Sequence, residues 1–139
     1  MMKGYRADTY SQIETLAFMA LWERAHAVFC RNLEAQIAEP VLKALVGRIA
    51  RDEERHEEFF ANLISHCLGY SRDETVEAIA RRAEGLDVIG GDIDAYQDKV
   101  AAMADAGIFD RDLLRTVIAD RITAWGLVDE PRLAQFISS

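Results

Sequence analysis

The sequence predicts an all-α fold built around two long helices, and three observations support this prediction. Apolar residues recur at intervals of three and four along the chain, which is the spacing of an amphipathic helix. β-Branched residues are scattered, and the alternation of polar and apolar residues that is typical of a strand is absent. With 139 residues, half of them apolar, the chain has the length and the core material of one helical domain over residues 1–139.

Two long helices are expected first. The first should run from an N-cap at Asp8 or Thr9 to about Ile37, and the second from Pro40, which suits a first helical turn, to a stop at Gly69. Each would contain about 29 residues and extend about 40 Å, because an α-helix rises about 1.5 Å per residue. A short connection makes neighbouring helices antiparallel, so the pair should form a hairpin that is half of a four-helix bundle.

Shorter amphipathic helices follow, and each has a start or stop signal. Ser71 and Glu74 have the spacing of a capping box. Glycines at 85, 90, 91 and 107 interrupt the later helical patterns, and Asp110 is placed to cap another helix. The expected ranges are 72–83, 92–106, 110–125 and a short helix after Pro131.

Charge and composition exclude several classes of protein. The net charge is −8 and the isoelectric point is about 4.8, which argues against a nucleic-acid binder because such proteins need a basic surface. The N-terminal residues MMKGYRADTY lack the apolar region of a signal peptide, and no apolar run approaches the length of a bilayer span. We therefore expect a cytoplasmic protein in which Cys30 and Cys67 are packed, reduced thiols, with a disulfide between them as the alternative.

Charged residues interrupt the apolar seams of both long helices. In the second helix, Glu53 and His56 fall on a seam of three- and four-residue steps, whereas the neighbouring residues 54, 55 and 58 fall away from it. In the first helix, Glu23 takes such a position among small residues. The two seams comprise Leu42, Val46, Ile49, Glu53, His56, Phe60, Leu63 and Cys67, and Leu16, Ala20, Glu23, Ala27 and Cys30.

The inward charges at Glu23, Glu53 and His56 need a partner, because a carboxylate taken out of water destabilises the fold unless it is paired. They are the ligand types of di-metal sites in helical bundles, where two helices each give a Glu and two others each give a Glu-x-x-His pair. Residues i and i+3 share one helix face, so a carboxylate can bridge two metals while the imidazole binds one of them. The alternative is a surface helix whose Glu-x-x-His pair only forms salt bridges.

Other catalytic motifs are absent from the sequence. The pair His56-Glu57 does not extend to a zinc-protease motif, because Phe60 stands where the second histidine would be. There is no glycine-rich phosphate loop, nucleophile elbow or cysteine pair with zinc spacing. His66 is expected to be exposed or to cap a helix end, and His26 lies in no motif of this kind.

Several stretches of the chain resemble a known family. ALWERAHAVF at 20–29, the Pro-Val-Leu step at 40–42, IARDEERHE at 49–57 and ITAWGL at 122–127 are similar to segments of the soluble acyl-carrier-protein desaturases, closest to the mycobacterial branch of the stearoyl-type enzymes. The resemblance implies a ferritin-like helical bundle. It also implies a di-iron, oxygen-dependent oxidoreductase of fatty acid biosynthesis that inserts a double bond into a carrier-bound fatty acyl chain.

The resemblance also assigns roles to individual residues. It implies that Glu23 is a single-carboxylate ligand to iron, that Glu53 is the bridging ligand and that His56 is the histidine ligand. Asp52 resembles a carboxylate that orients such ligands. His26 stands near the oxygen site, where the plant enzymes carry a threonine, so the chain departs from the family there.

A larger departure is the number of ligands. Family members carry an earlier helix pair with another Glu and another Glu-x-x-His, whereas this chain begins near the family's midpoint, at Met2-Lys-Gly-Tyr. Three hypotheses follow. The chain is the C-terminal half of a desaturase, inactive unless another chain completes it, or it is an inactive helical scaffold or binding remnant that self-associates. In the third, two copies together supply the full ligand set.

The resemblance also implies partners. These are an acyl carrier protein with its fatty acyl chain and an electron donor such as ferredoxin. Carrier proteins are acidic, so docking would need a basic patch, for which Arg48 with Arg51, or Arg81 with Arg82, are candidates. The apolar sides of the two long helices would otherwise face water, which predicts a homo-oligomer.

Overall fold

A computed structural model describes residues 11–88 and 93–137, and every regular element within these ranges is helical. The predicted all-α fold is therefore confirmed. No helix in the described ranges combines the length and the apolar character needed to span a membrane. The α-helices are α1 (Gln12–Gln36), α2 (Pro40–Tyr70), α3 (Arg72–Glu84), α4 (Gln97–Asp105), α5 (Arg111–Ala124) and α6 (Ala134–Ile137), and the 3-10 turns η1 (Asp94–Tyr96) and η2 (Pro131–Leu133) precede α4 and α6.

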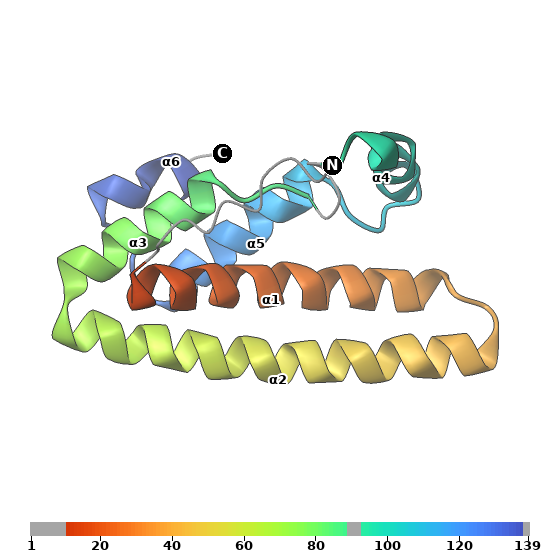
Figure 1. Cartoon of the computed structure of the whole chain (residues 1–139), viewed down its shortest axis with the longest axis horizontal. Coiled ribbons are helices and arrows are strands. Elements are labelled where there is room, and N and C mark those ends of the chain that lie inside the picture. The colour runs from red at the N-terminus through yellow and green to blue at the C-terminus, as the bar shows by residue number, and fades with distance from the viewer. Residues whose placement is uncertain (1–10, 89–92, 138–139) are drawn as a thin grey trace.

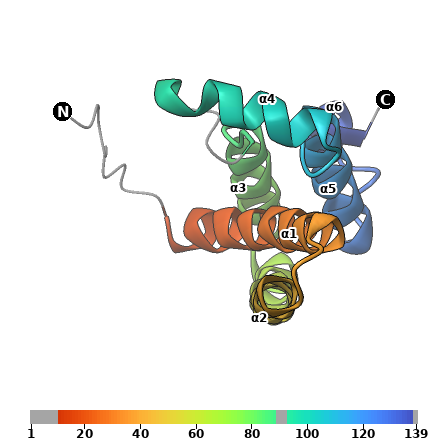
Figure 2. The same ribbon diagram turned by 90° about the vertical axis from the view of Figure 1, so that its right-hand side faces the viewer.

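The helices are stacked in layers around α1 (Figure 1). α1 and α2 run antiparallel and contact each other along their length, so the predicted hairpin is confirmed. α3, α5 and α6 lie on the side of α1 opposite to α2, and an end-on view places α4 in that upper layer as well (Figure 2). α1 is thus the middle layer, and α2 forms an outer layer.

Side chains cap the starts of three helices. The hydroxyl of Ser11 accepts a hydrogen bond at 3.2 Å from a backbone N–H in the first turn of α1. Glu39 caps α2 by accepting two backbone hydrogen bonds, at 3.0 and 2.6 Å. Asp110 caps α5 as predicted, with a bond of 2.8 Å. The other predicted caps, Asp8 and Thr9, lie outside the described residues.

The joint between α2 and α3 differs from the prediction. α2 does not stop at Gly69 but continues to Tyr70, because the N–H of Ser71 still donates to the carbonyl of Cys67 at 2.8 Å. Ser71 alone separates the two helices, but its side chain makes no capping hydrogen bond, so the predicted capping box does not form. The helix expected over 92–106 begins, in its described part, with the turn η1 and continues as α4.

The main core lies between α1 and the upper layer. Ala17, Ala20 and Ala25 of α1 are at most 2% exposed, and such small residues let other helices approach closely. Ile79 of α3 and Ile122 of α5 are fully buried in the same cluster. Burying an aliphatic side chain of this size stabilises a fold by about 1.5–3 kcal/mol. The core therefore holds α1 in place from the side that faces away from α2.

The face of α2 that packs against α1 overlaps the predicted seam only in part: Val46 is buried and Glu53 faces α1, as predicted. Of the predicted seam, Leu42 and Ile49 are 47% and 39% exposed, and Glu54, which was expected to fall away from it, reaches Arg31 of α1. The reason is that α2 is apolar on two neighbouring faces, and steps of three and four fit both of them. The buried line consists of Val46, Gly47, Ala50, Glu57, Ala61 and Ile64.

Both cysteines are free thiols, as predicted. Cys30 is buried and Cys67 is half-buried. Burial, followed by the charge of Glu53, raises the pKa of the Cys30 thiol. A buried thiol with a raised pKa is unreactive, so Cys30 acts as a small apolar residue in the packing of α1 against α2.

Candidate metal centre

Two carboxylates and an imidazole meet between α1 and α2. Glu23 and His26 lie one turn apart on α1, and Glu53 faces them from α2. One ligand atom from each of these residues lies within 4.8 Å of the other two. The closest approach among the ion pairs is from His26 Nδ1 to Glu53 Oε2, at 3.2 Å. The neighbours of Glu23 on the same face of α1, Ala20 and Ala27, are buried and small, which leaves room for the carboxyl groups.

One oxygen of the Glu23 carboxylate has no donor. Glu23 is 8% exposed, and its Oε2 is buried without a hydrogen-bond partner in the described part of the chain. His56 Nδ1 is 3.7 Å from this oxygen, which is too far for a hydrogen bond. Because an unpaired, buried, ionised carboxylate is strongly destabilising, this carboxyl group either carries a proton or faces a cation.

The two carboxyl groups titrate differently. Burial, the hydrogen bond with Glu53 and the charge of Glu53 raise the pKa of Glu23 to about 7. Burial acts in the same direction on Glu53, but the hydrogen bond from Glu23 and the interactions with His26 and His56 outweigh it, and the pKa of Glu53 lies below its usual range. Without a metal, the pair therefore holds one proton on Glu23 below about pH 7, and metal binding would displace such a proton.

His56 lies at the exposed rim of this cluster, so the prediction that its side chain points into the interior is wrong. Its Nδ1 is 3.7 Å from Glu23 Oε2 and 3.8 Å from Glu53 Oε2, and 57% of its side chain is exposed. Asp52 lies further out, with 64% of its side chain exposed, and pairs with Arg55 at 3.9 Å. The cluster is therefore dry on the Glu23 side and open to solvent on the His56 side.

The donor set fits the metal that the resemblance implies. Carboxylate oxygens and imidazole nitrogens are ligand types that iron uses in proteins, and the unpaired oxygen of Glu23 is an atom that a cation would satisfy. The hairpin offers Glu23 from one helix and the Glu53/His56 pair from the other. A di-iron carboxylate site in a helical bundle uses twice this set, so the described residues match one half of such a site.

A buried ion pair beside this cluster was missed in the sequence. Glu57 of α2 is 6% exposed and accepts a hydrogen bond from Arg121 of α5 at 2.8 Å, while Arg24 of α1 lies 3.5 Å from its other oxygen. The guanidinium of Arg121 also lies over the ring of Trp125, whose indole N–H donates to the carbonyl of Ala61 on α2. The sequence could have predicted that Glu57 is buried, because Glu57 lies on a second line of three- and four-residue steps along α2.

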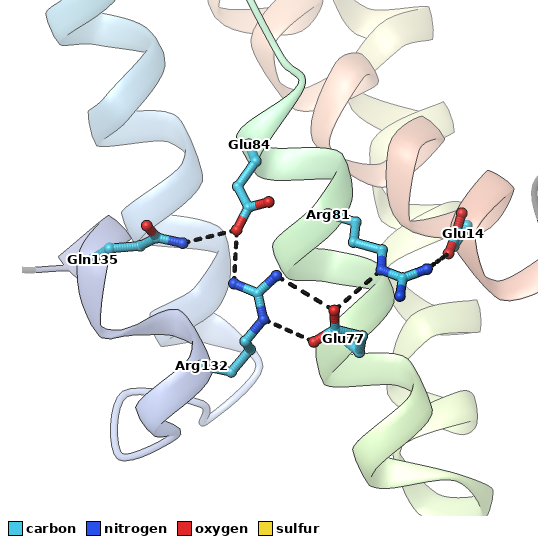
Figure 3. Close-up of polar contacts among 6 residues, drawn as sticks. All are labelled: Glu14, Glu77, Arg81, Glu84, Arg132 and Gln135. Carbon is cyan, nitrogen blue, oxygen red and sulfur yellow. Dashed lines mark hydrogen bonds and ion pairs between the residues drawn. The ribbon is translucent and has the colours of Figure 1, made fainter.

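Two further networks tie the layers together. Arg31 of α1 donates two hydrogen bonds to Glu54 of α2, at 2.6 and 3.0 Å, and a third to Glu34 at 2.9 Å. In the upper layer, Arg132 of η2 donates to Glu77 at 2.7 Å and to Glu84 at 2.6 Å, both on α3 (Figure 3). These contacts fix the hairpin and the C-terminal helices, respectively.

The two candidate basic patches differ in whether their arginines are bound by nearby carboxylates or exposed. Arg81 is bound to Glu77 and Glu14 at 3.1 and 3.2 Å (Figure 3), and these hydrogen bonds raise its pKa. Arg48 and Arg51 of α2 are both exposed. Of the two candidate patches, the one at Arg48 and Arg51 is therefore the more accessible to an acidic partner.

Comparisons with known proteins agree with these features. The family model described as "Fatty acid desaturase" matches residues 1–135. DesA2 of Mycobacterium tuberculosis, named as a candidate acyl-[acyl-carrier-protein] desaturase, is 64% identical over 138 residues, which cover 99% of this chain and 50% of DesA2. Acyl-[acyl-carrier-protein] desaturase 7 of rice, Oryza sativa, a chloroplastic protein, is 28% identical over 123 residues, which cover 81% of this chain and 30% of the rice protein.

A solved structure gives the same result for the fold. The X-ray structure of DesA2 from Mycobacterium tuberculosis H37Rv matches with a TM-score of 0.90 at 62% identity, over 95% of this chain and 56% of that chain. The helices described above are thus arranged as in DesA2, which confirms the expected ferritin-like bundle. The chain spans half or less of the length of the curated relatives it matches. On the family match and the identity to DesA2, the chain belongs to the fatty acid desaturase family.

Proposed function

We propose that this chain supplies half of the metal site of an acyl-[acyl-carrier-protein] desaturase, an oxidoreductase that acts on a carrier-bound fatty acyl chain. One observation carries the proposal. Glu23 of α1 meets Glu53 of α2 and the rim residue His56 around a buried carboxylate oxygen that has no donor. Membership of the fatty acid desaturase family and the names of the related proteins support the reaction class.

The proposed roles follow from where the residues lie. Glu23, buried on α1, is the single-carboxylate ligand, Glu53 is the bridging ligand and His56 is the imidazole ligand. His26 positions Glu53, because its Nδ1 lies 3.2 Å from Glu53 Oε2. Asp52 would orient His56 from the solvent side, since carboxylates commonly receive the free N–H of a ligand histidine. Iron, when bound, would supply the oxygen-dependent redox chemistry.

The protein around the cluster holds these ligands in place. Ala20 and Ala27 exclude water from the α1 side of Glu23. Arg121 binds Glu57, the residue next to His56, and so fixes that turn of α2 against α5. A ligand that is held on two packed helices keeps its geometry better than a ligand on a loop, which suits a site that must bind metal reproducibly.

A complete di-iron site needs a second Glu and a second Glu-x-x-His pair. In the proposal these come from a second polypeptide segment, and residues 1–139 act as one helical unit that is inactive alone. The acyl carrier protein would dock through the exposed basic residues Arg48 and Arg51, and a ferredoxin-type donor would supply electrons. The cytoplasm, where such carriers and donors occur, is the proposed location.

Iron binding tests the proposal directly. The purified chain is loaded anaerobically with Fe(II), desalted and analysed for bound iron, alongside the Glu23→Gln and Glu53→Gln variants. We expect the wild-type chain to retain iron and both variants to lose it, because each removes a charged ligand from the cluster. Glu58→Gln is the matched control, since Glu58 is exposed on the other face of α2 and should not matter.

The opposite outcome supports a different class of protein. If the wild type and the Glu53→Gln variant hold the same trace of iron and both self-associate, the chain is a helical scaffold and the metal proposal is wrong. Activity provides the second measurement. Desaturation of an acyl-carrier substrate should appear only when a polypeptide with the first half of a DesA2-type protein is added, and it should not appear with the Glu23→Gln chain.

A further inference from the structure

α1 carries a Glu-x-x-His pair of its own. Glu23 and His26 are three residues apart on α1, as Glu53 and His56 are on α2. Residues at this spacing share one face of a helix. The family resemblance assigns the pair on α2 to iron, but position 26 is a threonine in the plant enzymes and is not among the ligands that the resemblance implies. His26 therefore adds a nitrogen donor that the proposed function does not use as a ligand.

The two pairs lie head to tail, because α1 and α2 run antiparallel (Figure 1). His26 Nδ1 on α1 lies 3.2 Å from Glu53 Oε2 on α2. His56 Nδ1 on α2 lies 3.7 Å from Glu23 Oε2 on α1. Each imidazole thus faces the carboxylate of the opposite helix. Two nitrogen donors and two carboxylates from packed helices converge on the same region.

The distances fit a single cation. A first-row divalent metal binds imidazole nitrogen and carboxylate oxygen at about 2.0–2.2 Å, so neighbouring ligand atoms on one ion are about 3.0–3.5 Å apart. The 3.2 Å from His26 Nδ1 to Glu53 Oε2 is such a separation. With Glu23 included, the three ligand atoms lie within 4.8 Å of one another. The side chain of His56 is 57% exposed, so it has room to approach from the rim.

The unpaired oxygen of Glu23 points to a cation at the same place. This Oε2 is buried and has no hydrogen-bond partner among the described residues. The next residue along α1, Arg24, has its guanidinium 3.5 Å from Glu57 instead. A cation between Glu23 and Glu53 would neutralise two carboxylates that otherwise lie close together in a largely buried environment.

We propose that His26 is a metal ligand, and that this chain by itself binds one divalent cation through Glu23, His26 and Glu53, with His56 completing the site. The inference rests on the proposed function, because it uses the same carboxylates. It differs in that one chain suffices for one ion. Two imidazoles and two carboxylates suit Fe(II), Zn(II) or Mn(II) better than Mg(II) or Ca(II), which prefer oxygen ligands. In the absence of a cation, the same nitrogen of His26 positions Glu53.

Nitrogen NMR tests whether His26 binds the metal or only positions Glu53. The chain has three histidines, so the ring signals of a ¹⁵N-histidine-labelled protein can be assigned with single variants. In EDTA, Nδ1 of His26 should show the shift of a protonated nitrogen, because it faces a carboxylate. One equivalent of Zn(II) should move it to the shift of a metal-bound nitrogen, since a ligating nitrogen carries no proton.

Zinc affinity is the second measurement, by competition with a chromophoric chelator. The wild type should bind one zinc per chain. His26→Thr, which introduces the plant residue, should weaken binding at least about tenfold, because even residues that only orient ligands contribute that much. His66→Gln is the matched control, since His66 is exposed elsewhere on α2 and should not matter. Circular dichroism in EDTA checks that each variant is folded.

The outcomes separate this inference from the proposed function. If zinc binds and Glu23→Gln abolishes binding, while Nδ1 of His26 stays protonated and His26→Thr binds equally well, the inference is wrong and the proposed function stands. If zinc binds through His26 but adding the first half of a DesA2-type protein never yields desaturation, the inference stands and the proposed function is contradicted. A wild-type chain that binds neither Zn(II) nor Fe(II) overturns both.

Discussion

Arg121 of α5 donates a hydrogen bond from Nη2 to Oε1 of Glu57 of α2 at 2.8 Å, where only 18% and 8% of the two side chains are exposed. Arg24 of α1 lies 3.5 Å from the other oxygen of Glu57, so one carboxylate joins three helices. Burial lowers the pKa of Arg121, and the Glu57 charge counters that effect. The pair therefore lies in a low-dielectric environment, where losing one partner leaves an uncompensated charge.

Arg121→Ala should lower the free energy of unfolding by about 2–4 kcal/mol, because Glu57 keeps only the longer contact with Arg24. The measurement is urea unfolding followed by circular dichroism. In the double variant Arg121→Met with Glu57→Leu the loss should be smaller than in the single variant, since no charge is left buried. Equal losses in the single and double variants would show that the pair contributes through packing alone.

Glu23→Gln should separate metal binding from stability. In EDTA at pH 8 the variant should be at least as stable as the wild type, because the wild type buries a carboxylate oxygen without a donor and an amide removes that charge. Fe(II) should raise the melting temperature of the wild type and leave that of the variant unchanged. Thermal unfolding with and without Fe(II) measures both effects. A metal-dependent rise of equal size in the variant would contradict a role for Glu23 as a ligand.

The Arg132 network should make stability depend on pH in the acid range. The hydrogen bonds from Arg132 lower the pKa of Glu77 and of Glu84. A carboxyl group with a lowered pKa in the folded state stabilises the protein above its unfolded pKa, near 4.5, and this stabilisation is lost as the pH falls through the folded pKa. Arg132→Gln should therefore flatten the dependence of unfolding free energy on pH below about 5.

A matched control for this pH experiment is Arg115→Gln. Arg115 pairs with Asp112 at 3.3 Å, but the two side chains are 78% and 88% exposed, and exposed pairs of this kind contribute little. Urea unfolding over pH 3 to 7 should give the same profile for the control and the wild type. If Arg132→Gln also keeps the wild-type profile, the network of Figure 3 does not set the acid stability.

Arg31 should stabilise the hairpin through its geometry as well as its charge. It binds both oxygens of Glu54 with two parallel hydrogen bonds, which lysine cannot do. Arg31→Ala should lower the free energy of unfolding by about 0.5–1 kcal/mol, after allowance for the solvent exposure of both side chains. Arg31→Lys should lower it by most of that amount. Arg55→Ala, which removes a weak exposed pair with Asp52, is the control and should change little.

Sequence periodicity predicted the positions of the helices and the inward position of Glu23, because α1 is enclosed on several sides and its small residues leave few faces to choose from. It succeeded only in part for α2, since two neighbouring faces of that helix are apolar. The predicted seam placed Val46 and Glu53 correctly, but it also ran through the exposed residues Leu42, Ile49 and His56, and it missed the buried Glu57. Which face meets α1 depends on contacts with α5 that lie far away in the sequence.

The pairing of residues across helices could not be predicted in the same way. Glu57 has plain helical surroundings in the sequence, and only the fold brings Arg121 to it from 64 positions further along. The same holds for His26, which carries no motif and yet lies 3.2 Å from Glu53. Local patterns fix periodicity and caps, whereas long-range packing decides which charges meet.

The joint at Ser71 has a mechanical consequence. Ser71 is both the C-cap of α2 and the N-cap of α3. The length of this joint therefore determines which face of α3 points toward the core. Each added or deleted residue would rotate α3 by about 100°, since a helix has about 3.6 residues per turn. Val76, Ile79 and Ala83 would then leave the core together. The length of this joint therefore determines whether the upper layer packs correctly against the hairpin.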